Sequence, residues 1–166
     1  MPSGMALNCD DILGWLREEE PTRLETLWGK ADALRSETVG EAVHLRGLVE
    51  ISNYCARKCG YCGLRAERRN LERYRMSAGE ILACAHQAVS YGYGTVVLQS
   101  GEDQCITRDW LASVVLRIKE ETPLAVTLSL GERPWEDLAA WREAGADRYL
   151  LRFETSDPVL YALIHP

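Results

Sequence analysis

The sequence predicts an α/β fold in which repeated βα units build a parallel sheet, about half of a (β/α) barrel, preceded by N-terminal helices. Apolar runs that can form strands begin near residues 95, 124 and 147, which leaves about 23–29 residues per unit, the length of a βα repeat. Amphipathic helical stretches lie between these runs. Four strands can be counted in the 166 residues, whereas an eight-stranded barrel takes about 250 residues. A doubly wound sheet fits the same repeats.

The amino-terminal part predicts two helices and a first strand. Apolar residues recur at helical spacing over residues 10–20 and 22–35. Residues 42–51 then alternate between apolar and polar and end in β-forming residues. We therefore expect a helical extension over residues 1–41 and the half barrel over residues 42–166.

Helices and strands are expected to alternate from residue 77 onward. Ser77 and Glu80 are spaced as a capping box, Thr107 can cap a helix, and Asp157 with Pro158 can begin a short last one. The expected helices cover residues 77–91, 107–121 and 134–145, and the expected strands cover residues 95–98, 124–130 and 147–151.

Composition excludes several classes of protein. A hydrophobic content of 46% in 166 residues is enough for one core. A net charge of -6 disfavours a nucleic-acid binder held by phosphate contacts. No apolar run approaches the roughly 18–20 residues of a membrane span, and the amino terminus lacks the pattern of a signal peptide. We expect a cytoplasmic protein without nucleic-acid or membrane partners, whose six cysteines are thiols or metal ligands.

Three cysteines form a C-x3-C-x2-C run directly after the first predicted strand. Cys55, Cys59 and Cys62 lie within eight residues, a density of thiols that suits an iron–sulfur cluster or zinc. A structural zinc site needs four ligands, and the nearest further candidates, His44 and Cys84, lie in predicted regular elements. Three ligands describe a cubane cluster with one iron left open for a substrate. Zinc and three unrelated core cysteines are the alternatives.

The cysteine run resembles the cluster loop of the radical S-adenosylmethionine (SAM) enzymes, with Tyr61 as the aromatic residue before the third cysteine. Further segments look more closely like the HydE family, the radical SAM maturases of iron-only ([FeFe]) hydrogenase. Methylornithine synthase and biotin synthase are similar relatives and are the alternatives among enzymes. A non-catalytic iron–sulfur or zinc-binding fragment is the alternative from another class. The segments are Ser52–Cys55, Cys62–Arg65, Arg73–Met76, Leu98–Asp103, Thr127–Glu132 and Ala144–Arg152, followed by Glu154 and Thr155.

The resemblance covers roughly residues 40–166 and implies a radical SAM barrel of the TIM type. In the family the barrel continues beyond the last strand seen here, so we expect an N-terminal fragment. The family's chemistry is reductive cleavage of SAM by a 4Fe-4S cluster, which yields a 5′-deoxyadenosyl radical. The resemblance also implies an electron donor such as ferredoxin or flavodoxin, a small-molecule or iron–cysteine complex as substrate, and companion hydrogenase maturases as partners.

Polar residues follow each predicted strand at its carboxyl end, where ligands bind in parallel α/β folds. They are Gln99, Ser100, Gly101 and Glu102 after the second strand, Ser129 and Glu132 at the third, and Arg152 and Glu154 after the fourth. Carboxylates suit the ammonium or ribose hydroxyls of SAM, and an arginine suits its carboxylate. Ordinary loop polarity is the alternative. The resemblance assigns Tyr61, Gln99, Gly101, Glu102, Ser129, Arg152 and Glu154 to the SAM pocket.

The segment from Arg57 to Arg75 holds seven basic residues against two acidic ones. Such charges can offset thiolates and an anionic substrate, or dock an acidic redox partner. A solvated loop and helix face explains them equally well. The remaining cysteines, Cys9, Cys84 and Cys105, are interpreted as structural.

Overall fold

The computed structural model describes residues 7–166, which divide into two compact units between Val43 and His44. The first unit contains α1 (Cys9–Leu16) and α2 (Pro21–Val39). Both predicted helices are therefore present, although α1 ends earlier and α2 extends further than the sequence indicated. The side chain of Asn8 caps α1 by accepting a hydrogen bond from the amide of Asp11 at 2.9 Å.

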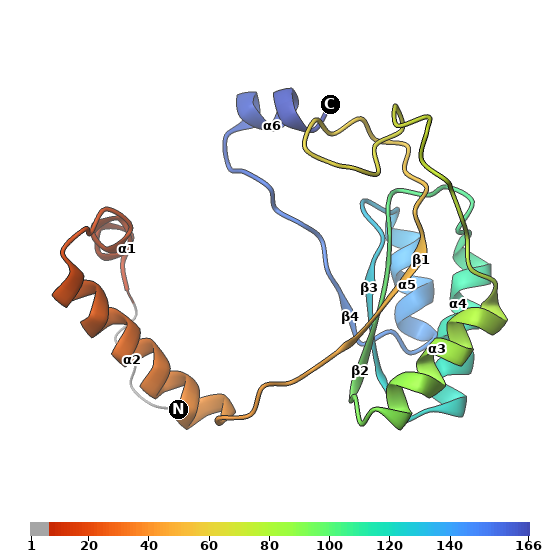
Figure 1. Cartoon of the computed structure of the whole chain (residues 1–166), viewed down its shortest axis with the longest axis horizontal. Helices are drawn as coiled ribbons and strands as arrows, with labels where there is room; N and C mark the ends of the chain where they lie inside the picture. The colour runs from red at the N-terminus through yellow and green to blue at the C-terminus, as the bar shows by residue number, and fades with distance from the viewer. Residues whose placement is uncertain (1–6) are drawn as a thin grey trace. The chain divides into compact units, whose positions relative to one another are not determined.

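The second unit is a four-stranded parallel sheet in the order β1-β2-β3-β4, with a helix after each strand (Figure 1). Its elements are β1 (Gly47–Ser52), α3 (Ala78–Ser90), β2 (Thr95–Ser100), α4 (Arg108–Glu121), β3 (Ala125–Ser129), α5 (Trp135–Glu143), β4 (Arg148–Tyr149) and α6 (Pro158–Ile164). This order confirms the α/β prediction of four βα units. The predicted caps at Ser77, Thr107 and Asp157 are confirmed as well.

Two strands differ in length from the prediction. β1 begins at Gly47 rather than at residue 42, which leaves His44 outside any strand. β4 contains only two residues, paired with Thr127 and Leu128 of β3. Beyond β4 the amide of Leu150 still donates to the carbonyl of Leu128 at 2.8 Å, but the side chains of Leu150 and Leu151 are exposed.

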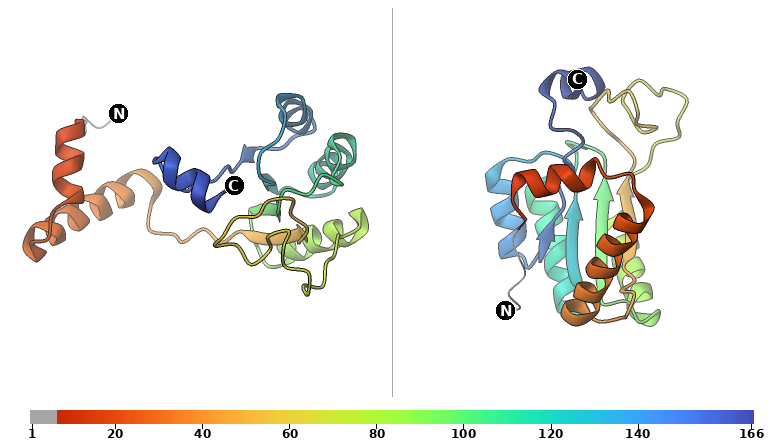
Figure 2. Two further views of the ribbon diagram at one scale, coloured as in Figure 1. Left: turned by 90° about the horizontal axis from the view of Figure 1, so that it is seen from above. Right: turned by 90° about the vertical axis from the view of Figure 1, so that its left-hand side faces the viewer.

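Helices α3, α4 and α5 lie on one face of the sheet (Figures 1 and 2). Strand residues alternate between the two faces: Val96 and Leu98 are fully buried against the helices, whereas Val97 and Gln99 point to the opposite face. Helix residues such as Ile118 complete this core. No helix in the described part of the chain is long and apolar enough to cross a membrane.

Candidate functional site

The candidate site lies at the carboxyl end of the sheet. A segment without helix or strand, residues 53–74, connects β1 to α3 and carries the three clustered cysteines; we call it the cysteine loop. Figure 1 shows this loop and α6 together over the end of the strands. The amide of Gly60 donates a hydrogen bond to the carbonyl of Ile164 at 3.0 Å, which joins the loop to α6.

One pocket at this end brings together every site residue predicted from the sequence. Its lining includes Cys55, Cys59, Tyr61, Cys62, Gln99, Gly101, Glu102, Ser129, Arg152 and Glu154. These residues come from the cysteine loop and from the segments at the ends of β2, β3 and β4. The remaining cysteines, Cys9, Cys84 and Cys105, do not line it.

The three cysteines of the loop are free thiols. Cys59 is the most buried at 6% exposure, and burial together with the neighbouring Cys55 and Cys62 raises the pKa of its thiol. Three thiols along one pocket fit a cubane cluster, in which each thiolate binds a different iron atom. Within residues 7–166, no three His, Cys, Asp or Glu side chains converge as the ligands of a single metal ion do.

Gly101 allows the loop after β2 to touch the cysteine loop. A Cβ atom at this position would lie 2.5 Å from the carbonyl oxygen of Tyr54 and 2.6 Å from the Cβ of Cys55, closer than any side chain tolerates. The resemblance assigned Gly101 to the SAM pocket. In the structure, its missing side chain makes room for the backbone that leads into the first cysteine.

Glu102 has a partner that the sequence did not indicate. The guanidinium of Arg57, in the cysteine loop, donates to the Glu102 carboxylate at 2.7 Å and to the Glu132 carboxylate at 2.7 Å. The Glu102 bond is the main cause of the raised pKa of Arg57. A Cβ at Gly131, which has a φ of 74°, would lie 2.2 Å from the Cγ of Glu102, so this glycine leaves room for the Glu102 side chain.

The segment after β4 supplies Arg152 and Glu154, both exposed residues along the pocket. Glu154 has a φ of 27°, a conformation that non-glycine residues rarely adopt and that often occurs at functional sites. Burial and the nearby Glu154 carboxylate raise the pKa of Tyr61 to about 12. The structure thus brings the aromatic residue of the cysteine loop close to the end of β4.

The pocket lining also includes residues that were not predicted from the sequence, among them Glu50, Tyr161 and His165. Glu50 is paired in register with Gln99, which is paired in turn with Ser129, so the three side chains share one face of the sheet. The alternation of Glu50 between the apolar Val49 and Ile51 was a usable signal. No pattern in the sequence indicated that α6 would fold back over the pocket.

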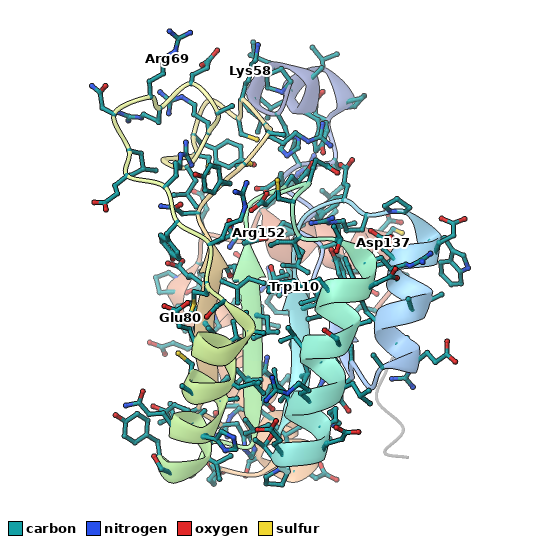
Figure 3. All side chains as sticks on the ribbon, turned by 90° about the vertical axis from the view of Figure 1, so that its right-hand side faces the viewer. Lys58, Arg69, Glu80, Trp110, Asp137 and Arg152 are labelled. Carbon is teal, nitrogen blue, oxygen red and sulfur yellow. The ribbon has the colours of Figure 1, made fainter. Side chains whose placement is uncertain are left out.

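The basic residues of the segment from Arg57 to Arg75 divide into two groups. Arg73 points inward and donates to the carbonyls of Leu64 and Arg65, each at 2.9 Å, as well as to that of Asn53. Lys58 and Arg69 are exposed, and Figure 3 shows both at the outer end of the cysteine loop. Arg73 therefore binds the backbone of its own loop, a role that neither interpretation of the sequence included, whereas Lys58 and Arg69 lie on a solvated surface.

Over residues 49–166 the sequence matches the Radical SAM superfamily. The chain belongs to this superfamily. Members of the superfamily use a 4Fe-4S cluster and S-adenosylmethionine, and the homologues of this chain are enzymes. The resemblance and the cofactor class inferred from the cysteine run are thereby confirmed.

Individual relatives are similar over most of this chain. The [FeFe] hydrogenase maturase subunit HydE of Thermotoga maritima is 50% identical over 142 residues, which cover 86% of this chain and 40% of HydE. A biotin synthase of Leptospira interrogans is 35% identical over 142 residues, 81% of this chain and 40% of the relative. The crystal structure of methylornithine synthase (PylB) matches with a TM-score of 0.86 at 29% identity, covering 97% of this chain and 48% of PylB. The chain thus spans less than half the length of these relatives.

Proposed function

We propose that this chain forms the cluster-binding and SAM-binding part of a radical SAM enzyme of the HydE type, acting in maturation of the [FeFe]-hydrogenase active-site cluster. The observation that carries the proposal is the single pocket that collects all ten predicted residues at the carboxyl end of the sheet. The 50% identity with a hydrogenase maturase supports the assignment to this member of the superfamily.

Cys55, Cys59 and Cys62 would hold the 4Fe-4S cluster through their thiolates. When bound and reduced, such a cluster supplies the electron that cleaves SAM to methionine and a 5′-deoxyadenosyl radical. The protein's own share is to bind SAM beside the cluster, to orient it, and to exclude water from the pocket.

The polar residues of the pocket suit the groups that SAM presents. The guanidinium of Arg152 can bind the SAM carboxylate through two parallel hydrogen bonds, and Glu154 can accept from the ammonium or the ribose hydroxyls. Gln99 and Ser129 lie on the same face of the sheet and offer further hydrogen bonds. Together with Arg152, they would set the orientation of SAM.

The remaining predicted residues line the pocket on the side of the cysteine loop. One carboxylate oxygen of Glu102 accepts from Arg57 at 2.7 Å. The other accepts a longer bond from the amide of Glu132 at 3.4 Å and would accept from the SAM ammonium as well. Gly101 keeps the backbone close to the first cysteine. Tyr61 would contact SAM from the side of the loop.

Substrate and partners follow from the same assignment. The substrate would be a small molecule or an iron–cysteine complex that serves as precursor of the hydrogenase cluster. Companion maturases and an electron donor such as ferredoxin or flavodoxin would act with the enzyme. A reducing compartment such as the cytoplasm suits three thiols that must remain available to iron.

The test is anaerobic reconstitution of the full chain with ferrous iron and sulfide, followed by reduction in the presence of SAM. We expect about four iron atoms per chain and formation of 5′-deoxyadenosine. Cys59→Ser should abolish both, whereas Cys105→Ser, an exposed cysteine outside the pocket, should change neither. A Cys59→Ser protein that still forms 5′-deoxyadenosine would contradict the proposal, as would tight zinc binding without SAM cleavage.

Methylornithine synthase is the second candidate, because the match to its crystal structure covers 97% of this chain with a TM-score of 0.86. The two candidates share the cluster and the SAM cleavage, so those measurements do not separate them. Product analysis does: formation of 3-methylornithine by the whole enzyme would favour the second candidate.

A further inference from the structure

Asp103 is a buried carboxylate just beyond the predicted SAM-pocket residues. It is 3% exposed and, within the described residues, the only charged residue in the buried class. One carboxylate oxygen accepts from the hydroxyl of Ser52 at 2.6 Å and from Nε of Arg75 at 2.6 Å. The other accepts from Nη2 of Arg75 and from the amide of Cys105, each at 3.0 Å. The carboxylate is therefore fully hydrogen-bonded.

These bonds join Asp103 to both ends of the cysteine loop. Ser52 is the last residue of β1, and its hydroxyl also accepts from the amide of Tyr54 at 3.1 Å. Arg75 follows the loop and forms an isolated antiparallel bridge with Ser52. Its guanidinium lies 3.7 Å from the centre of the Tyr54 ring, the residue before the first cysteine.

Asp103 and Arg75 do not line the pocket, so these two side chains are placed to act through the loop rather than on a bound molecule. The loop itself has little apolar packing: of residues 53–74, only Cys59 is buried. A segment without regular structure or a core of its own depends on hydrogen bonds for its position. Asp103 provides those bonds at the point where the loop leaves and rejoins the domain.

We propose that Asp103 and Arg75 form a latch that fixes the cysteine loop to the end of β2 and so sets the positions of its three thiols. Both are positioning residues, because they act through Tyr54 and Ser52. The significance for cluster binding rests on the proposed function. The latch itself concerns this chain alone and can be tested without iron.

The first test measures alkylation of Cys59 by iodoacetamide in the cluster-free full chain, followed by mass spectrometry. Cys59 is 6% exposed, so it reacts only when the loop opens. Asp103→Asn should raise its alkylation rate about tenfold, because reactions of a transiently open state follow its population. Cys9, exposed in α1, is the internal reference and should react at an unchanged rate. An unchanged Cys59 rate would overturn the latch.

A matched control separates opening of the loop from general loss of stability. Asp147 lies at the opposite end of the sheet and, like Asp103, accepts hydrogen bonds from a backbone amide and from a cation. The donors are the amide of Val126 at 2.7 Å and Nζ of Lys119 at 3.1 Å. Asp147→Asn should leave the Cys59 alkylation rate near that of the wild type. Equal acceleration by both variants would mean global unfolding and would overturn the latch.

A conservative variant keeps the test valid if Asp103→Asn does not fold. Arg75→Lys retains the positive charge but loses the two-pronged bond to the carboxylate. It should accelerate Cys59 alkylation by an intermediate factor of about two to five. A rate equal to that of the wild type would contradict the proposed geometry.

The second test links the latch to the cluster. After anaerobic reconstitution, Asp103→Asn should release iron to a ferrous chelator several times faster than the wild type, and the electron paramagnetic resonance spectrum of its reduced cluster should change. If the wild-type chain held no 4Fe-4S cluster, the proposed function would be refuted. The alkylation of Cys59 would then be the test of whether the latch exists. If the cluster were equally stable and gave the same spectrum in the wild type and in Asp103→Asn, the latch would have no role in cluster binding.

Discussion

The two ends of the sheet each carry an aspartate that binds a cation and a backbone amide, yet the two arrangements serve different parts of the molecule. At the amino end, Asp147 joins Lys119 of α4 to Val126 of β3, elements already held by apolar packing. At the carboxyl end, Asp103 holds a loop in which one residue is buried. The same polar chemistry therefore adds to stability at one end and determines position at the other.

Removing core volume should have the largest effect on the free energy of unfolding, and this effect should concern the sheet as a whole rather than either of its ends. Leu98 is fully buried in β2, so Leu98→Ala should lower the free energy of unfolding by about 2–5 kcal/mol. Chemical denaturation followed by circular dichroism measures it. A loss below about 1 kcal/mol would show that the helix-covered face is not the main source of stability.

Gly101→Ala should produce the next largest effect, concentrated at the carboxyl end. The added Cβ would meet the Tyr54 carbonyl at 2.5 Å, so the cysteine loop must shift, at a cost of about 1–3 kcal/mol. Cys59 should become more reactive toward iodoacetamide. Gly94→Ala, where nothing lies within 4 Å of the added atom, is the matched control and should leave Cys59 unchanged. Similar Cys59 rates in the two variants would contradict the close contact.

The sequence predicted the strands and helices well because their apolar residues recur with the period of each element. It located β1, β2 and β3 through the runs that end in Ile51, Leu98 and Leu130, all buried in the structure. It overestimated β4, since the apolar residues Leu150 and Leu151 continue the pattern beyond the strand, which ends at Tyr149, and their side chains are exposed.

Sequence reasoning grouped the pocket residues correctly because carboxyl ends of parallel strands share one edge. Their partners depend on tertiary contacts between residues far apart in the chain. Arg57 and Glu102 lie 45 positions apart, and Asp103 and Arg75 lie 28 apart, so no local pattern reveals either pair. For this reason the sequence indicated no partner for Glu102 and assigned no role to Asp103.

The pH dependence of stability should show whether the charge of Asp103 contributes at the carboxyl end of the sheet. Burial alone would raise the pKa of Asp103, but hydrogen bonds from Arg75, Ser52 and the Cys105 amide outweigh it and lower the pKa below its usual value near 3.8. Because the folded-state pKa is lowered, the stabilisation is complete above the unfolded pKa and is lost as pH falls through the folded pKa.

The Asp103→Asn variant should therefore be less stable than the wild type by about 1–2 kcal/mol between pH 5 and 7, a value limited by the partial exposure of Arg75. The difference should begin to shrink below about pH 4, where the carboxylate of the unfolded chain takes up a proton, and should be lost only below the lowered pKa of the folded state. Urea denaturation at pH 7, 5 and 3 measures it. A difference that is the same at all three pH values would mean that the charge of Asp103 does not contribute.

The smallest effect is expected at the exposed edge of the same end, where Arg57 joins Glu102 to Glu132. Arg57→Gln should cost at most about 1 kcal/mol of stability, because the side chains of Arg57 and Glu132 are partly in water, and the cost should decrease with added salt. Arg117→Gln, which removes an exposed pair with Glu121 on α4, is the matched control and should cost a similar amount. Only the Arg57 variant should also speed Cys59 alkylation, by about twofold. The reason is that the backbone carbonyl of Glu102, the partner of Arg57, accepts a hydrogen bond from the amide of Ala56 at 3.0 Å and so holds the loop near the first cysteine. If the two variants matched in both readouts, the carboxyl end would hold its loop through Asp103 alone.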